Sequence, residues 1–282
     1  MEKLSLGVIT GLHPTPGEAL ANVRRLGIPT VQVQYPQALD SEAGVLQIEA
    51  ALRETGIEIT AVFCGYEGES YADIPAIQKT VGLVPDATRE ERLARTERIS
   101  RFAARLGVDH VAAHLGFIPH DTSTTYLDVV ASVRGVCDAL AARNQVFALE
   151  TGQETASALK QFILDVNKPN LRVNFDPANM ILYGNDNPTE ALPLLSPYIV
   201  SVHCKDGCWP TQAGTLGEET PLGEGDVDFG PWLRALLASG FCGPLTIERE
   251  ISGEEQERDI LRARMLIEEM LAANAQSESQ AQ

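Results

Sequence analysis

Two hydrophobic patterns alternate along almost the whole chain. Short runs of β-branched and other apolar residues are typical of buried strands, and longer segments with apolar residues three or four positions apart are typical of helices. Each short run is followed, after a gap rich in Gly, Pro or Asp, by a segment of the second kind. This order predicts a parallel sheet whose strands are joined by helices. The eight expected strands span residues 4–10, 30–35, 58–64, 110–114, 146–150, 171–175, 199–203 and 245–248.

A helix is expected after every strand, and several of these segments end in the Leu-Gly or Thr-Gly pairs that commonly terminate helices. Eight strand–helix units in about 250 residues are typical of a closed (β/α)8 TIM barrel, an α/β fold, whereas an open doubly wound sheet usually has about five or six strands. A Rossmann-like open sheet is the alternative, but no G-x-G-x-x-G motif follows the first strand. The expected helices span residues 16–26, 43–55, 89–106, 123–143, 155–166, 189–195, 229–239 and 255–272.

Two connections after strands are unusually long, at residues 65–88 and 204–228. Long loops in compact domains are commonly functional, and in a barrel both would emerge at the face where substrates bind. We therefore expect them to form walls or lids of the site. No linker divides the chain, so a single barrel domain is expected over residues 1–272, followed by a polar, disordered tail at residues 273–282.

Composition changes this picture mainly by excluding partners. The chain is 44% hydrophobic, as in ordinary folded proteins, and its 39 Asp and Glu outnumber its 22 Lys and Arg, which gives a net charge of −17. Without a visible basic stripe, this charge disfavours nucleic acids and anionic membrane surfaces as partners. No apolar run approaches the roughly 20 residues of a membrane span. Five scattered cysteines, and a first segment without the pattern of a signal peptide, favour the cytoplasm.

Four neighbouring strands of the expected barrel end in ionisable residues, Glu150, Asp176, His203 and Glu248. In a barrel, the carboxyl ends of these strands point at one spot on the same face. Three carboxylates held close together would repel one another unless a cation binds between them. Three oxygen ligands and one imidazole suit Mn²⁺, with Mg²⁺ and Co²⁺ as alternatives, better than they suit structural zinc. The sequence therefore predicts a site for one divalent metal ion.

The order of several short segments resembles a known family. Glu150 is followed by FDPANM, SVHCKDG, PLGEGDVDF and GPLTIERE, at residues 175–180, 201–207, 221–229 and 243–250. This order resembles the sugar isomerase and epimerase branch of the xylose isomerase-like TIM barrel superfamily, which includes ketose 3-epimerases and inosose dehydratases. The resemblance covers nearly the whole chain. It implies an isomerase or epimerase of carbohydrate metabolism that holds its metal with Glu150, Asp176, His203 and Glu248.

The resemblance also implies a role for the two glutamates, Glu150 and Glu248. They would lie on opposite faces of a bound sugar and act as an acid/base pair, because a carboxylate can bind a metal through one oxygen and keep the other as a base. A metal that binds the carbonyl and neighbouring hydroxyl oxygens would acidify the adjacent C–H bond by stabilising an enediolate. Return of the proton on the opposite face would epimerise the sugar, and return at the neighbouring carbon would isomerise it.

Six further residues are candidates for binding the sugar, because each ends or follows a strand at the expected substrate face. They are His13, Tyr66, His114, Glu154, Asn179 and Lys205. Structural roles are the alternative for several of them: a core histidine at His114, a solvated acid at a helix N-terminus for Glu154, or an ion pair between Lys205 and Asp206.

Two positions depart from the ketose 3-epimerase pattern. Asn179 stands where those enzymes usually carry a histidine, and the segment HCKDGCWP at residues 203–210 lacks their nearby arginine. Asparagine can still hydrogen-bond a hydroxyl group, but it cannot act as an acid or carry charge. These departures favour an oxidised or derivatised sugar, a cyclic keto-polyol or a sugar acid over a simple free ketose.

Three other functions stay open at this stage. A lyase would keep the metal and the base but would expel water from the enediolate. An enzyme similar to endonuclease IV would need further His and Asp ligands, and the net charge of −17 disfavours DNA. A non-catalytic sugar-binding barrel would be expected to lose a metal ligand, and all four are present. We expect a small carbohydrate as partner, and apolar residues on the outer helices are compatible with a homo-oligomer.

Overall fold

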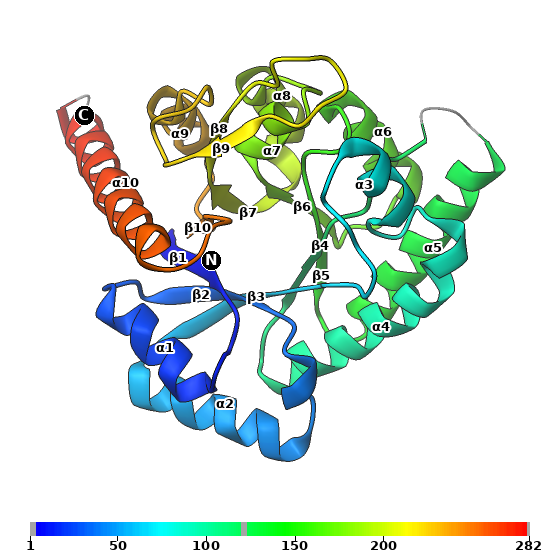
Figure 1. The fold of residues 1–282 in the computed structure, drawn as a ribbon, viewed down its shortest axis with the longest axis horizontal. Helices are drawn as coiled ribbons and strands as arrows, with labels where there is room; N and C mark the ends of the chain where they lie inside the picture. The colour runs from blue at the N-terminus through cyan, green and yellow to red at the C-terminus, as the bar shows by residue number, and fades with distance from the viewer. Residues whose placement is uncertain (1–3, 120–122, 281–282) are drawn as a thin grey trace.

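A closed barrel of eight parallel strands forms the centre of the molecule (Figure 1). The computed structural model describes residues 4–119 and 123–280. Each strand pairs with the next one in the series, and the last closes the barrel on β1. The expected TIM barrel is confirmed, and the open-sheet alternative is wrong. The strands are β1 (Ser5–Thr10), β2 (Thr30–Gln34), β3 (Glu58–Phe63), β4 (His110–Ala113), β5 (Val146–Glu150), β6 (Leu171–Phe175), β7 (Ile199–Cys204) and β10 (Pro244–Ile247).

In Figure 1 the helices α1, α2, α4, α5, α6, α8, α9 and α10 follow one another around the barrel in chain order, whereas α3 and α7 lie out of this order. Every expected helix is present, and the ends differ by a few residues except at the C-terminus. The helices are α1 (Pro16–Arg25), α2 (Glu42–Thr55), α3 (Ile74–Thr80), α4 (Asp86–Arg105), α5 (Thr124–Ala141), α6 (Ala156–Val166), α7 (Pro177–Leu182), α8 (Pro188–Leu195), α9 (Phe229–Ala238) and α10 (Glu254–Gln280).

Local signals explain where several helices begin and end. The hydroxyl groups of Thr15, Ser41 and Thr155 accept hydrogen bonds from backbone N–H groups in the first turns of α1, α2 and α6. Each hydroxyl satisfies a donor that has no partner within its helix. α2 ends at Gly56, whose φ of 69° is left-handed and therefore suits glycine.

The strands are buried on both faces, because side chains fill the barrel on one side and helices cover the other. Every residue of β4 and β10 is buried. Phe175 at the end of β6 packs against Trp232 of α9, with ring centroids 5.4 Å apart, and Phe229 lies 5.7 Å from the same tryptophan. This packing fixes the carboxyl end of β6, directly before a candidate metal ligand.

Two helices, α3 and α7, and two strands, β8 and β9, were not expected from the sequence, and all lie beyond the carboxyl ends of barrel strands. α3 lies within the long connection 65–88, and α7 begins two residues after β6 ends. The connection 204–228 contains an antiparallel hairpin of β8 (Asp206–Cys208) and β9 (Glu218–Thr220). Each of these elements has too few residues to display a hydrophobic period, which is why the pattern did not reveal them.

The C-terminal segment also differs from the expectation. α10 continues to Gln280, so residues 273–280 are helical where we expected a disordered tail. The segment lacks Gly and Pro, and it extends a helix that is already nucleated upstream, which is much easier than starting a new one. The last two residues of the tail lie outside the described part of the chain. Within that part, no helix has the length and apolar character needed to cross a membrane.

Candidate metal centre and substrate cavity

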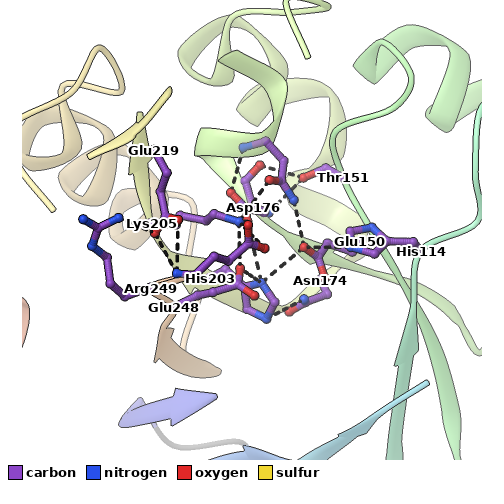
Figure 2. A network of polar contacts seen from close by, with 12 residues as sticks. His114, Glu150, Thr151, Asn174, Asp176, His203, Lys205, Glu219, Glu248 and Arg249 are labelled. Carbon is purple, nitrogen blue, oxygen red and sulfur yellow. Dashed lines mark hydrogen bonds and ion pairs between the residues drawn. The ribbon is translucent and has the colours of Figure 1, made fainter. Parts of the chain in front are cut away.

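The four ionisable residues that end neighbouring strands converge at the carboxyl end of the barrel (Figure 2). Glu150 is the last residue of β5, Asp176 follows β6, His203 lies in β7 and Glu248 follows β10. These strands are neighbours in the barrel. One ligand atom from each residue lies within 4.8 Å of all the others, so the group could hold a metal ion.

His203 lies at the centre of this group. Its Nδ1 atom is 3.0 Å from Glu248 Oε2, 3.4 Å from Glu150 Oε1 and 3.7 Å from Asp176 Oδ2. Glu150, Asp176 and His203 are buried, and the Glu248 side chain is 10% exposed. The centre is therefore shielded from water on the barrel side and opens through Glu248.

Three buried polar atoms of this group have no hydrogen-bond partner: Glu150 Oε2, Asp176 Oδ2 and His203 Nδ1. Buried polar atoms without partners are rare in folded proteins because each one costs free energy. A divalent cation among these residues would give Asp176 Oδ2 and His203 Nδ1 a partner, and it would also cancel the repulsion among the carboxylates. The donor set, three carboxylates and an imidazole, suits Mn²⁺ or Mg²⁺ with further positions left for substrate. The residues present thus fit a bound metal.

Asp176 has two tasks. Its Oδ1 atom accepts a hydrogen bond of 2.9 Å from the backbone N–H of Asn179 and so caps α7. Its Oδ2 atom is left to face His203. The Thr151 hydroxyl bonds both the backbone N–H and the backbone C=O of Asp176, at 2.8 Å each. Asp176 can therefore cap α7 with one oxygen and leave the other available for a metal ion.

The electrostatics of the centre keep its groups charged. Burial alone would raise the pKa of Glu150 and Glu248, but His114 and His203 lower it for Glu150, and Lys205 and His203 lower it for Glu248. Burial raises the pKa of Asp176 to about 6, and Lys205 only partly opposes this. The two glutamates are thus deprotonated near neutral pH, as a base or a ligand must be.

Asn174 supports His203 from the other side and was not predicted from the sequence. Its Nδ2 atom lies 2.9 Å from His203 Nε2, and its Oδ1 atom accepts a hydrogen bond of 2.5 Å from the Ser201 hydroxyl. A histidine that binds metal through Nδ1 carries its proton on Nε2. The Asn174 side-chain oxygen can accept a hydrogen bond from that N–H group once the amide is reversed in orientation. The signal was available, because residues 174 and 176 lie on the same face of a strand.

Lys205 is buried beside the centre and is 2% exposed. Its ammonium group lies 3.0 Å from Glu250 Oε1, 3.3 Å from Glu248 Oε2 and 3.8 Å from Asp176 Oδ2. Burial opposes its charge, but these carboxylates raise its pKa well above the ordinary value. The alternative considered above, a pair with Asp206, is not the one formed: Asp206 bonds backbone N–H groups of the loop around the hairpin.

Asn179 lies between this lysine and a candidate ligand. Its Nδ2 atom donates to Glu150 Oε1 at 2.8 Å, and its Oδ1 atom accepts from Lys205 Nζ at 3.3 Å. It also lines a small cavity beneath the hairpin. Asn179 is therefore placed both to orient Glu150 and to reach a substrate.

His114 borders the centre on the opposite side from Lys205. Its Nε2 atom lies 3.6 Å from Glu150 Oε1, and Gln153 lies 3.3 Å from its Nδ1 atom. Its ring packs against Phe63 and Tyr71, with centroids 5.4 and 5.6 Å away. Gln153 and Tyr71 were not predicted, because no local pattern distinguishes a loop residue that turns into a cavity.

Three other expected sugar contacts lie further from the centre. The Tyr66 hydroxyl hydrogen-bonds the Thr96 hydroxyl of α4 at 2.7 Å, so that group is directed into the protein. His13 is exposed and lines the outside of the site. Glu154 is buried, its Oε2 atom has no hydrogen-bond partner, and burial raises its pKa to about 8. His13 and Tyr66 each line a cavity that Glu248 also lines, whereas Glu154 lines none of the three cavities described below.

Three cavities lie at or next to the candidate metal centre, and Glu248 lines two of them. The outer cavity has a volume of about 760 Å³ and lies between β2, β3 and α4, with Tyr35, Phe63, Tyr71, Arg95 and Glu248 in its lining. A side cavity of about 560 Å³ lies next to α1 and α10 and shares Glu248. A hairpin cavity of about 150 Å³ lies beneath β8 and β9. Glu250 lines all three.

An ion-pair network holds the β8–β9 hairpin against the barrel (Figure 2). Glu219 of β9 lies 3.2 Å from Arg249 Nη1 and accepts the backbone N–H of Glu250. Arg249 also pairs with Asp259 of α10 at 2.9 Å. The hairpin, the end of β10 and α10 are thereby connected next to the site.

Comparisons with known proteins agree with this architecture. A crystal structure of a xylose isomerase domain protein from Planctomyces limnophilus is 40% identical, covers 97% of this chain and 99% of its own, and superposes with a TM-score of 0.93. A xylose isomerase-like TIM barrel protein from Mycobacterium smegmatis in complex with magnesium is 18% identical, covers 97% and 98% of the two chains, and has a TM-score of 0.73. The second likeness is one of fold alone.

A curated relative matches over a shorter stretch. L-ribulose-5-phosphate 3-epimerase UlaE from Salmonella paratyphi A is 36% identical over 107 residues, which is 36% of this chain and 36% of that protein. The match thus spans little more than a third of the length of that relative. The family model described as xylose isomerase-like TIM barrel matches residues 20–270. By fold and by sequence, the chain belongs to the xylose isomerase-like TIM barrel family.

Proposed function

We propose that the protein is a divalent-metal-dependent sugar epimerase or isomerase that moves a proton on a carbon next to a carbonyl group. The observation that carries this proposal is the convergence of four ligand atoms within 4.8 Å, three of them on buried residues. An epimerase among the curated relatives supports the same class of reaction.

Glu150 and Glu248 are the proposed acid/base pair. They stand at the two ends of the row of four ligands, on β5 and after β10, so a sugar between them would meet one on each face. Each turns one oxygen toward His203 Nδ1 and keeps a second oxygen that can take up a proton. One glutamate would remove the proton and the other would return a proton to the opposite face.

Neighbouring residues prepare this pair for proton transfer. Asn179 holds Glu150 Oε1, and Lys205 approaches Glu248 Oε2, so one oxygen of each carboxylate is fixed in place. A divalent ion, when bound among the four residues, would polarise the sugar carbonyl and stabilise negative charge on its oxygen; we expect Mn²⁺, with Mg²⁺ and Co²⁺ as alternatives. Burial of the centre strengthens the electrostatic interactions among these groups, because little water is present to screen them.

Metal analysis followed by proton exchange tests the proposal. We expect one divalent ion per chain in the purified protein, and deuterium entering a sugar next to its carbonyl group in D₂O, read by NMR. Asp176→Asn should lose the metal and the exchange together. A protein that holds no divalent metal in any buffer would contradict the proposal, as would metal content unchanged by Asp176→Asn.

The same incubation separates epimerisation from water loss. An epimer changes optical rotation without an ultraviolet chromophore, whereas a dehydratase product contains a conjugated carbonyl group that absorbs. We expect no absorbance increase during exchange. A chromophore that grows in step with substrate loss would assign the site to a lyase instead.

A further inference from the structure

The outer cavity is larger than one sugar ring requires. Its volume of about 760 Å³ extends from Glu248 at the metal centre past Tyr71 to Tyr35 and Arg95. Cavities of roughly 300–1,000 Å³ hold drug-sized ligands. A monosaccharide placed against Glu150 and Glu248 would therefore leave most of this space unfilled, and the space continues directly from the reacting end.

Aromatic rings form the part of this cavity that is closest to the centre. Tyr71 is 43% exposed and lines both the outer cavity and the hairpin cavity, and Phe63 lies beside it against His114. An exposed aromatic ring at a cavity wall offers a flat apolar surface. The C–H face of a sugar ring or an aromatic group attached to the sugar would pack on this surface.

The charges of the outer cavity disfavour a phosphate group. Four carboxylates line it (Glu67, Glu69, Glu248 and Glu250), and Arg95 is its single arginine or lysine. Arg95 donates to the backbone C=O of Gly65 at 2.8 Å and to Gln37 Oε1 at 2.7 Å, which uses two of the five N–H donors of its guanidinium group. The surplus of carboxylates over this one guanidinium gives the lining a net negative charge, which repels a phosphate group.

The other three cations near the site are paired with carboxylates. Lys205 is buried among Asp176, Glu248 and Glu250 and lines none of the three cavities described above. Arg25 and Arg249, both in the side cavity, pair with carboxylates of α10.

TIM barrels commonly bind phosphate with the last two strand–helix loops and a helix N-terminus. Here the first turn of α10, which follows the last barrel strand, carries Glu254, Glu255 and Glu257. Its N-terminal positive end is therefore already balanced by acidic side chains.

We propose that the substrate of this site is an unphosphorylated sugar glycoside, with its keto-sugar ring at the metal centre and its second group in the outer cavity. The inference rests on the proposed function, since it assigns a substrate class to that same reaction. It separates this chain from the curated relative, which acts on a sugar phosphate by its name.

Three substrates with the same reacting carbonyl group test the inference. They are 3-keto-D-glucose, its 6-phosphate and its phenyl β-glycoside, each incubated with metal-loaded protein in D₂O. We expect kcat/KM for the glycoside to exceed that for the free sugar by about tenfold, and the phosphate to fall below the free sugar by a similar factor. Calorimetric titration with phenyl β-D-glucoside, D-glucose and D-glucose 6-phosphate should give the same order of affinities without catalysis.

Two variants connect the preference to the cavity. Tyr71→Ala should lower kcat/KM for the glycoside toward the value for the free sugar. Tyr71→Phe keeps the ring and should therefore retain the higher kcat/KM for the glycoside. Glu67→Lys should raise kcat/KM for the 6-phosphate relative to that for the free sugar, because it reverses a charge on the cavity wall. A Tyr71→Ala protein that keeps the full glycoside preference would overturn the role given to this wall.

The outcomes separate the two proposals. If the phosphate is used as well as or better than the glycoside, the substrate class is wrong while the metal-dependent proton transfer stands. If the protein binds metal and exchanges protons on ketoses such as D-fructose but on none of the three glucose derivatives, the substrate class is again wrong. If no sugar shows metal-dependent exchange, the proposed function fails and the inference fails with it.

Discussion

The two halves of the barrel rim have opposite characters. The strands β5, β6, β7 and β10 end in Glu150, Asp176, His203 and Glu248, which are packed, hydrogen-bonded and largely shielded from water. The strands β1 to β4 end in neutral residues, although His114 follows β4 at the edge of the centre, and the segments after β2 and β3 form the walls of a wide cavity. Buried, mutually constrained groups suit chemistry that requires fixed distances, and an open wall suits recognition. The comparison indicates that the reaction is fixed by one half and the substrate is selected by the other.

The largest effect is expected at Glu248, which belongs to the half of the rim with the four ionisable residues. Glu248→Gln should lower kcat by about 10²–10⁴-fold because it removes a general base, while the amide oxygen can still bind metal. Glu58→Gln is the matched control, since Glu58 lies exposed at the amino end of β3, on the opposite face of the barrel. Turnover and metal content of both variants check this. Equal losses in the two would contradict a site confined to the carboxyl ends of the strands.

A second effect is on stability and concerns Glu154, in the loop after β5. Its pKa is raised by burial from the ordinary 4.5 to about 8, so the fold favours the protonated form. Below about pH 4.5 Glu154 is protonated in the folded and unfolded states, and its contribution to the free energy of unfolding is fully present. This contribution is lost as the pH rises through about 8, because the unfolded chain ionises the group more readily. Glu154→Gln, which imitates the protonated acid, should therefore gain stability over the native protein as the pH increases from 5 to 8, on the order of a few kcal/mol.

Urea unfolding at several pH values measures this difference. The exposed Glu58→Gln variant should show no such trend between pH 5 and 8. A constant difference between Glu154→Gln and the native protein would mean that Glu154 is ionised in the folded state.

The support behind His203 gives a smaller effect. Asn174→Ala should weaken metal binding by about 10–100-fold, because it removes the partner that orients the imidazole. Metal titration followed by calorimetry checks this, and Asn174→Asp, which keeps an acceptor for Nε2–H, should recover part of the affinity. Unchanged affinity in the alanine variant would show that the four ligands alone determine metal binding.

The smallest effect is expected where the hairpin contacts the end of β10. Glu219→Gln removes the charge that pairs with Arg249 but keeps an acceptor for the Glu250 N–H group. KM should rise by no more than about tenfold while kcat changes less, because the side chain positions a wall and takes no part in proton transfer. Steady-state kinetics separate the two constants. A loss confined to kcat would place Glu219 in the chemistry.

The fold and the convergence of the four strand ends could be predicted because both follow from periodic patterns. Each strand is a short apolar run, and an acid or histidine directly after such a run must lie at the carboxyl rim of a closed barrel. Strand alternation also places Asn174, two residues before Asp176, on the same side of the chain as that aspartate. Asn174 was not predicted, because an amide inside a strand indicates no chemistry by itself.

The substrate residues were harder to predict, because their orientation depends on packing between distant segments. Tyr66 is directed to Thr96 of α4, thirty positions away, and Glu154 is buried although a loop acid is ordinarily solvated. Tyr71 and the hairpin strands β8 and β9 lie in segments without hydrophobic period. Only the folded chain shows which of these side chains face the cavity.

The shared use of Asp176 turns the start of α7 into a reporter of the site. One oxygen of this carboxylate receives the Asn179 N–H group, and the other faces the place where a cation would bind. A cation draws electron density from the carboxylate and so weakens the acceptor at the other oxygen. The chemical shift of a single backbone amide, that of Asn179, should therefore follow metal loading in an NMR titration, and occupancy could be read without substrate or a coloured metal.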